Sequence, residues 1–199
     1  MIKAIIFDMG GVVLKTRGIE DEGGYIAKNL KVNVKGFIEA EKKYEHDAQR
    51  GKMSMDEFLR RIANDLGIRK SLLSRVWKGM CSRIFIPYRD VLKAIDKMEE
   101  NGYKVALITN TVPYDSSYLR KKGLYDQFEH VILSHNTGYR KPEKQIYQMM
   151  LKKLGVKGNE CIYIDDREKN LPTAKKLGMK TIHFKSPRQF YRALRRMCT

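Results

Sequence analysis

Five short apolar runs, each rich in valine, isoleucine or both, limit the folds that this chain can adopt. They are Ala4–Phe7, Val105–Ile108, Val131–Leu133, Ile162–Ile164 and Thr181–Phe184. The last four alternate with helical patterns of moderate length, which is typical of βαβ units and a parallel sheet. The runs do not alternate polar with apolar residues, so both faces of the sheet should be covered. An α/β fold is therefore predicted.

A helical segment separates the first run from the others. Residues 15–88 contain helical patterns and no convincing strand. Ser54 and Glu57 have the spacing of a capping box, in which each side chain satisfies an amide near the other at a helix start. We expect a helical domain at 15–88, inserted into an α/β core domain that comprises 1–14 and 89–199.

Composition restricts the class of protein. The 199 residues are 42% hydrophobic and 32% charged, as in soluble globular proteins. No apolar run is long enough to span a bilayer, and the N-terminal residues do not form a signal peptide, so we expect a cytoplasmic location. Three widely spaced cysteines, Cys81, Cys161 and Cys198, indicate reduced thiols rather than a disulfide framework.

The formal net charge of +17 fits either a polyanionic partner or a lysine-rich solvated surface. Lysine and arginine are spread along the helical segments rather than gathered in one block. We therefore favour the solvated surface, and nucleic acid stays a possible partner. The sequence is equally compatible with a monomer and a homodimer.

Polar residues follow several of the predicted strands or lie in the loops after them. They are Asp8, Thr109, Asn110, Lys141, Asp165 and Asp166. Ligands of open parallel sheets bind outside the carboxyl ends of the strands, so these side chains should meet at one edge.

The chemical types of these residues suit each other. Asp8 precedes a glycine turn and can act as a nucleophile, with backbone amides holding an oxyanion. Lys141 supplies a positive charge for phosphate. Asp165 and Asp166 repel each other without a counter-ion, and with Asp8 they would form a site suited to Mg²⁺. Each feature alone has an ordinary structural interpretation, but their combination favours catalysis.

In these segments the chain resembles the haloacid dehalogenase superfamily, especially its phosphatase-like branch with a small helical cap. The matching segments are IIFDMGGVV, VALITNT, TGYRKPEKQIY and IYIDDREKN. The resemblance covers the core and puts the helical insertion where that branch carries its cap. It implies a Rossmann-like core, Mg²⁺, a small phosphorylated substrate and a covalent aspartyl-phosphate route.

The resemblance also implies a role for each residue. Asp8 would attack phosphorus, with Thr109 and Lys141 assisting catalysis. The phosphoryl group would be bound by Gly11, Thr109, Asn110 and Lys141. The metal would be held by Asp8, the backbone carbonyl of Gly10, Asp166 directly, and Asp165 through water or as a second-shell partner. Asn170 would orient the two adjacent aspartates.

Gly10 departs from the family pattern. Most phosphatases of this superfamily have a second aspartate there, which serves as general acid and base, and such a group is worth about 10²–10⁴-fold in rate. We favour substrates with good leaving groups, namely anomeric sugar phosphates (sugar-1-phosphates), aryl phosphates or acyl phosphates. A replacement acid among Glu20, Asp21 and Glu22 is an alternative, although a solvated acidic loop is the simpler interpretation. The third interpretation of Gly10 is that the protein binds a phosphorylated ligand and has weak turnover.

Other activities on this fold fit the residues less well. A mutase would need the missing acid even more, and a 2-haloacid dehalogenase would not need the Asp165–Asp166 pair. A phosphonate hydrolase would need a reactive cap lysine, and nothing distinguishes Lys42, Lys43 or Lys52 from surface lysines. The sequence therefore predicts a Mg²⁺-dependent phosphatase, with a nucleic-acid-binding protein as the alternative from another class.

Overall fold

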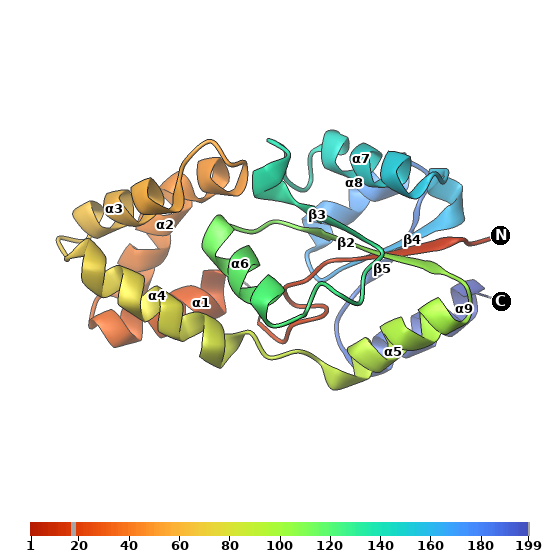
Figure 1. The fold of residues 1–199 in the computed structure, drawn as a ribbon, viewed down its shortest axis with the longest axis horizontal. Coiled ribbons are helices and arrows are strands. Elements are labelled where there is room, and N and C mark those ends of the chain that lie inside the picture. The colour runs from red at the N-terminus through yellow and green to blue at the C-terminus, as the bar shows by residue number, and fades with distance from the viewer. Residues whose placement is uncertain (17–18, 199) are drawn as a thin grey trace.

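A parallel five-stranded sheet forms the centre of the protein, in a computed structural model that describes residues 1–16 and 19–198 (Figure 1). The strands are β1 (Ala4–Phe7), β2 (Lys104–Thr109), β3 (His130–Leu133), β4 (Cys161–Asp165) and β5 (Lys180–His183), in the order β3-β2-β1-β4-β5. All five predicted strands are confirmed, with ends that differ by at most one residue.

The register of the sheet brings the carboxyl ends of three strands to the same level. Central β1 pairs with β2 and β4, and Ile5 lies opposite both Val105 and Ile162. The amide of Asp8 donates to the carbonyl of Ile164, 2.9 Å away. Because all three strands run in parallel, the residues that follow them meet at one edge of the sheet.

Helices cover both faces of the sheet, as the continuous apolar runs predict. Helices α5 (Arg89–Glu100) and α9 (Pro187–Cys198) lie on one face, and α7 (Lys144–Leu154) and α8 (Leu171–Lys176) lie on the other (Figure 1). Alternate residues of β1 enter different clusters: Ile5 and Phe7 pack with one pair of helices, and Ala4 and Ile6 with the other. This double coverage explains why the central strand β1 consists of apolar residues only.

Four further helices form a separate group beside the sheet (Figure 1). They are α1 (Ile19–Leu30), α2 (Val34–Gln49), α3 (Met55–Asp65) and α4 (Lys70–Ile84). They surround their own apolar cluster, in which the rings of Phe58 and Trp77 pack edge to face with centroids 5.6 Å apart. This arrangement supports our proposal of a cap at 15–88, with the short helix α6 (Pro113–Lys121) between it and the sheet.

The start of α3 follows the predicted capping box only in part. The hydroxyl of Ser54 accepts a hydrogen bond from the amide of Glu57, 3.2 Å away, as predicted. The Glu57 carboxylate, however, pairs with Arg60 and Arg61 rather than returning to the helix start. The arginines lie three and four residues on, where charge-assisted bonds are available, so they compete with the backbone amide.

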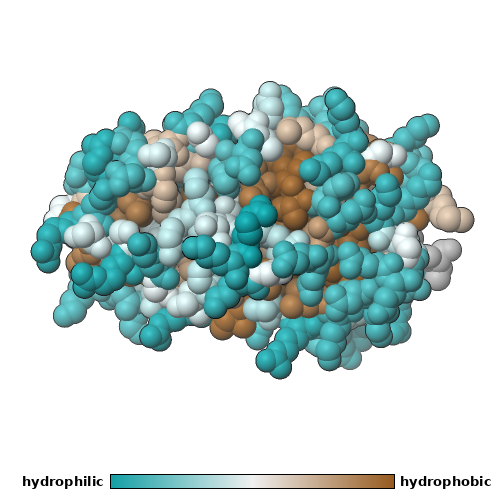
Figure 2. Space-filling model, in the orientation of Figure 1, coloured by the Kyte–Doolittle hydropathy of each residue, from teal (hydrophilic) through white to brown (hydrophobic). Residues whose placement is uncertain are grey.

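The surface is rich in hydrophilic residues, as the charged fraction of 32% predicts (Figure 2). Hydrophilic residues cover much of the face in Figure 2, over the cap as well as the core, with brown apolar areas between them. Within the described residues, no helix has the length and apolar character needed to cross a bilayer. Cys81 and Cys161 are buried free thiols, as expected, and the side chain of Cys198 lies outside the described part.

Candidate active site

A cavity of about 100 Å³ lies where the cap faces the carboxyl edge of the sheet. Its core lining includes Asp8, Gly10, Thr109, Asn110 and Lys141. Its other lining residues include Glu22, Glu45, Gln49 and Trp77 from the cap and Asp115 from α6. The predicted residues of β1, β2 and the Lys141 loop therefore do meet. The volume is below the range of about 300–1,000 Å³ for drug-sized ligands, so the cavity suits a small one.

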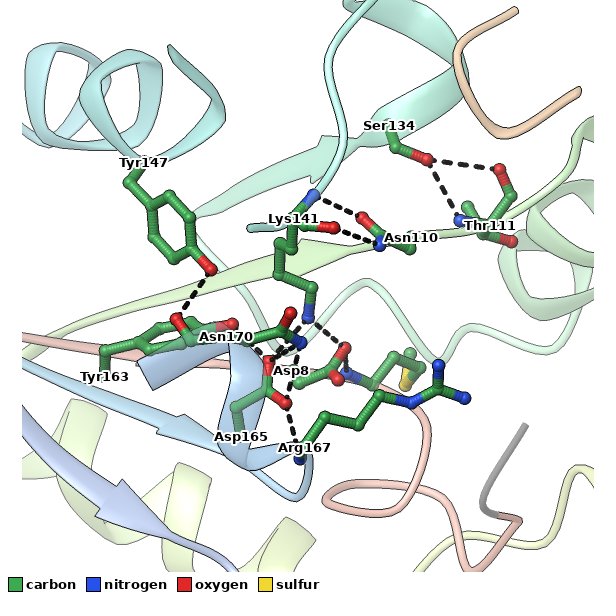
Figure 3. A network of polar contacts seen from close by, with 11 residues as sticks. Asp8, Asn110, Thr111, Ser134, Lys141, Tyr147, Tyr163, Asp165, Arg167 and Asn170 are labelled. Carbon is green, nitrogen blue, oxygen red and sulfur yellow. Dashed lines mark hydrogen bonds and ion pairs between the residues drawn. The ribbon is translucent and has the colours of Figure 1, made fainter. Parts of the chain in front are cut away.

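The ammonium group of Lys141 joins two carboxylates beneath this cavity (Figure 3). Its Nζ lies 2.7 Å from Oδ1 of Asp8 and 2.9 Å from Oδ2 of Asp165, and the side chain is only 1% exposed. Burial disfavours the charged amine, but the attraction of Asp165 and Asp8 outweighs it and raises the pKa of Lys141 above its usual range. Lys141 is therefore a fixed positive charge beside the candidate nucleophile.

Asp165 is held by hydrogen bonds on both carboxylate oxygens (Figure 3). Its Oδ1 accepts from the amide of Arg167 at 2.8 Å, and Nδ2 of Asn170 lies 3.0 Å from each oxygen. The hydroxyl of Tyr163 donates to Oδ2. Burial opposes ionisation, but Lys141 and these donors hold the pKa of Asp165 below its usual value. The predicted contact of Asn170 is thus present and falls on Asp165.

Asp8, the candidate nucleophile, directly follows β1. Its Oδ1 accepts from the amide of Met9 at 2.6 Å and also faces Lys141. Burial raises the pKa of Asp8 to about 7; Lys141 opposes this shift, and the charges of Asp165 and Asp166 add to it. A cation among these groups would favour the ionised form that a nucleophile needs.

The three aspartates also fit a divalent cation. One carboxylate oxygen from each of Asp8, Asp165 and Asp166 lies within 4.8 Å of the others. Oδ1 of Asp166 is buried and has no hydrogen-bond partner in the part of the chain that the structure describes. Burial, with the charge of Asp165, raises the pKa of Asp166. A hard cation such as Mg²⁺ would satisfy that oxygen, whereas the oxygens of Asp165 already have donors.

Thr109 and Asn110 contribute in different ways. Thr109 ends β2, is buried, and lines the cavity. Asn110 uses its side chain to hold the Lys141 loop: Oδ1 accepts from the Lys141 amide at 2.8 Å, and Nδ2 donates to the Lys141 carbonyl at 3.1 Å. Its side-chain amide therefore holds Lys141 in position, and phosphoryl binding by Asn110, which also lines the cavity, stays a prediction.

The adjacent glycines after β1 have different steric surroundings. A Cβ on Gly11, whose φ is +73°, would lie 2.2 Å from Oδ2 of Asp166. Among the described residues, a Cβ on Gly10 would meet only the carbonyl of Thr16, at an ordinary 3.7 Å. Gly11 and Asp166 line a second small cavity, not the one that contains Asp8, so substrate binding by Gly11 stays a prediction. Gly11 is required for the close approach of a candidate metal ligand.

Replacing Gly11 with alanine should therefore displace Asp166 and weaken the metal site. We expect Gly11→Ala to lower Tm and to raise the Mg²⁺ concentration needed for half-maximal turnover, because both φ and the contact are unfavourable. Gly138→Ala is the matched control, since Gly138 has φ +78° and no atom of the described residues lies within 4 Å of its Cβ position. An unchanged Mg²⁺ requirement in folded Gly11→Ala would contradict this role.

Several lining residues were not assigned to the site from the sequence. Asp115 is buried on α6 and accepts a hydrogen bond from Nε1 of Trp77 at 2.8 Å. Trp77, which the sequence suggests is a packing residue, is therefore also part of the cavity wall. Arg140 is buried too and donates to Gln49 of α2 at 2.9 Å. The position of Asp115 beside apolar Leu119 on one helical face is the sequence signal that could have identified it.

The predicted acidic loop after the first strand is wrong. Helix α1 begins at Ile19, so Glu22 is helical, and it lines the cavity. The glycines that suggested a loop lie inside the helix, and a Cβ on Gly23 would be 3.0 Å from Cγ1 of Ile38 on α2. Gly23 therefore allows two cap helices to approach each other. Asp21 is exposed.

The cap lysines do not reach this site. None of Lys42, Lys43 and Lys52 belongs to the described lining of the cavity, and Nζ of Lys43 pairs with Asp65 at 2.8 Å. The cap thus offers no lysine suited to a Schiff-base role within the described residues.

Comparison with known proteins agrees with this geometry. The family model for haloacid dehalogenase-like hydrolases matches residues 2–178. D-ribitol-5-phosphate phosphatase of Bacteroides thetaiotaomicron is 26% identical in an alignment that covers 91% of each chain. Sesquiterpene phosphatase astK of Aspergillus oryzae is 27% identical in an alignment that covers 91% of this chain and 89% of that protein.

Solved structures of related proteins share the fold. A HAD family enzyme of Bacteroides thetaiotaomicron, in complex with magnesium and inorganic phosphate, has a TM-score of 0.72 and 25% identity over 93% of this chain and 95% of that one. L-2-haloacid dehalogenase of Xanthobacter autotrophicus has a TM-score of 0.68 at 19% identity, over 98% and 83% of the two chains. With the match over 2–178 and the aspartates and lysine at one sheet edge, the chain belongs to the haloacid dehalogenase-like hydrolases.

Proposed function

We propose that this protein is a Mg²⁺-dependent phosphatase that hydrolyses a small phosphorylated metabolite. The reaction passes through a covalent intermediate in which the phosphoryl group is bonded to Asp8. The observation that carries the proposal is the pairing of Lys141 with Asp8 beside Asp165 and Asp166. The small cavity above them and the phosphatases among the relatives support it.

Each residue has a chemical task in this reaction. Asp8 attacks phosphorus, the alcohol leaves, and water then hydrolyses the phosphorylated carboxylate. Lys141 stabilises negative charge on the phosphoryl oxygens, and Thr109 binds one of them. Asp8, Asp166 and the Gly10 carbonyl would hold the metal. When bound, Mg²⁺ neutralises charge on the carboxylates and the phosphoryl group.

Gly10 should make the rate depend on the leaving group. Without a carboxyl at this position, we expect aryl, acyl and anomeric phosphates to react faster than simple alkyl phosphates. Gly10→Asp should raise kcat/KM toward alkyl phosphates, by up to about 10²–10⁴-fold, because it adds a positioned acid. A Cβ at Gly10 would lie at an ordinary contact distance of 3.7 Å from the Thr16 carbonyl, so a side chain can begin there without a clash with the described residues. Equal wild-type rates with both classes, with chemistry rate-limiting, would contradict this expectation.

A screen of phosphorylated metabolites tests the proposed function. Phosphate release is measured with Mg²⁺ and with a chelator in its place, alongside polynucleotide binding at increasing salt. The proposal predicts Mg²⁺-dependent release from at least one small phosphate ester. Tight, salt-sensitive polynucleotide binding without release from any ester would favour a nucleic-acid-binding protein instead.

A further inference from the structure

We propose that Glu22, on the cap, supplies the acid that Gly10 lacks and protonates the leaving-group oxygen. This inference rests on the phosphatase function proposed above. The acid would then lie on the cap instead of on the core. The position of the cap would therefore affect the chemical step as well as the choice of substrate. It also makes the leaving-group dependence of the wild type and the gain from Gly10→Asp smaller than expected for a site without an acid, because Glu22 already protonates the leaving group.

The position of Glu22 fits this task. It lies in the first turns of α1 and lines the same cavity as Asp8, Thr109 and Lys141. Its side chain is partly exposed, and the cavity that it lines is where a substrate bound to Asp8 would lie. A leaving group in this cavity would therefore be flanked by the sheet edge that holds the phosphoryl group and the cap that holds Glu22.

Charged groups from several elements surround Glu22. Asp115 faces it from α6, Glu45 from α2, Arg167 from the loop after β4, and Asp21 from its own helix. Burial, then the charges of Asp115 and Glu45, raise the pKa of Glu22 to about 8, while Arg167 acts in the opposite direction. At neutral pH the carboxyl is mostly protonated, as a general acid must be.

Asp115 complements Glu22. It accepts hydrogen bonds from Nε1 of Trp77 at 2.8 Å and from Sγ of Cys81 at 3.5 Å. Burial raises its pKa to about 6, although these donors lower it. The Trp77 and Cys81 donors favour ionised Asp115, so Glu22 is the carboxyl of the two that keeps its proton to higher pH. Environments that separate two neighbouring carboxyls in this way mark acid and base assignments. Asp115 is a positioning residue that keeps the proton on Glu22.

An independent observation indicates that a polar ligand enters this cavity. Thr16 is 3% exposed and lines the cavity, and its Oγ1 has no hydrogen-bond partner among the residues described. A buried hydroxyl without a partner is costly unless something else satisfies it. A hydroxyl or phosphoryl oxygen of a substrate would do so.

The proposed proton transfers balance over the cycle. As Oδ of Asp8 bonds to phosphorus and the P–O bond to the leaving group breaks, the Glu22 carboxyl gives its proton to that oxygen and an alcohol forms. The Glu22 carboxylate then takes a proton from water as the water oxygen attacks phosphorus. The bond between phosphorus and Asp8 breaks, phosphate leaves, and both carboxyls return to their starting states.

The test compares two leaving groups in Glu22→Gln. Release of the alcohol or phenol is measured in a single turnover, so that slow hydrolysis of phosphorylated Asp8 does not mask the first step. We expect the rate with an alkyl phosphate to fall by about 10²–10⁴-fold, while p-nitrophenyl phosphate, whose leaving group needs no proton, loses only a few-fold. The matched control is Glu39→Gln, since Glu39 is an exposed acid on α2 whose side chain is 63% accessible. It should leave both rates unchanged.

Stability separates a catalytic role from a structural one. A carboxyl whose pKa is higher in the folded than in the unfolded state destabilises the protein increasingly as pH rises from about 4.3, its unfolded value, to about 8. Glu22→Gln should therefore raise Tm at pH 8 while lowering activity. Asp115→Asn should move the alkaline limb of the pH–rate profile with alkyl phosphate to lower pH, because it removes a like charge.

The outcomes distinguish this inference from the proposed function. If Asp8→Asn abolishes turnover, but Glu22→Gln lowers both substrates equally or neither, Glu22 is not the acid and the phosphatase proposal stands. A fall in Tm at pH 8 in Glu22→Gln, together with equal losses on both substrates, would assign it a structural role. Turnover that survives Asp8→Asn would overturn the phosphatase route itself.

Discussion

Lys141→Met should destabilise the protein by about 3–5 kcal/mol at neutral pH, because it leaves two buried carboxylates without their counter-charge. For a chain of this size the loss corresponds to about 6–20 °C in Tm. Asp8 and Asp165 both lie within 3 Å of the Lys141 ammonium, and Asp165 is fully buried. Removing the lysine would oblige both acids to protonate or to remain charged in a poorly solvated site.

The effect should depend on pH with a defined sign. The lowered pKa of Asp165 contributes stability above the unfolded value of about 3.9, and that contribution is lost as pH falls through the folded value. The raised pKa of Lys141 contributes stability below the unfolded value of about 10.4. The Tm difference between the wild type and Lys141→Met should thus be full at pH 7, persist down to about pH 4, and shrink below that as Asp165 becomes protonated.

An exposed pair provides the control for this prediction. Nζ of Lys43 lies 2.8 Å from Asp65, much the same distance as in the Lys141–Asp165 pair, but the Lys43 side chain is 60% accessible. Water already solvates such a pair, so Lys43→Met should change Tm little. Thermal unfolding of both variants from pH 8 to below pH 4 makes the comparison. Equal Tm values for Lys141→Met and the wild type at pH 7 would contradict the assigned ion-pair network.

Asp8→Asn should lower phosphate release by about 10⁴-fold or more, because an amide cannot form the phosphorylated intermediate. The substitution keeps the size of the side chain and the acceptor for the Met9 amide. It also removes one of three crowded carboxylates, so Tm should not fall. Loss of turnover with unchanged Tm would locate the defect in the chemistry.

Asp65→Asn is the control for that substitution. Asp65 ends α3 and its carboxylate pairs with Lys43, away from the cavity lining. The same chemical change there should leave turnover unaltered, as measured by continuous phosphate release with saturating Mg²⁺. Release by Asp8→Asn at the wild-type rate would exclude Asp8 as the nucleophile.

The strands and the sheet edge were predictable because burial on both faces leaves a strong signal. Runs such as Ala4–Phe7 contain no polar residue and have a polar residue soon after them, so the sequence indicates both the strand and where it ends. A parallel sheet then brings Asp8, Thr109 and Asp165 together without further information. The core half of the candidate site follows from these two facts.

For the cap half the sequence offers only a set of candidates, Glu20, Asp21 and Glu22, since the choice among them depends on how helices pack. Helical periodicity does not indicate which face of α1 meets α2 and which faces the sheet. Gly23 suggested a flexible loop, but its lack of a side chain allows the approach of Ile38 instead. Glu22 therefore enters the cavity for a tertiary reason. Asp115 is similar, because only the folded chain brings Trp77 to it, a residue 38 positions away.

The proposed phosphatase reaction passes through phosphorylated Asp8, and this intermediate can be trapped. Wild-type protein is mixed with Mg²⁺ and an aryl phosphate, quenched in acid within the first turnovers, digested, and analysed by mass spectrometry. We predict a hydroxylamine-sensitive phosphoryl group on the peptide that contains Asp8, absent from Asp8→Asn. Steady turnover with that group on another residue, or on none, would contradict the account.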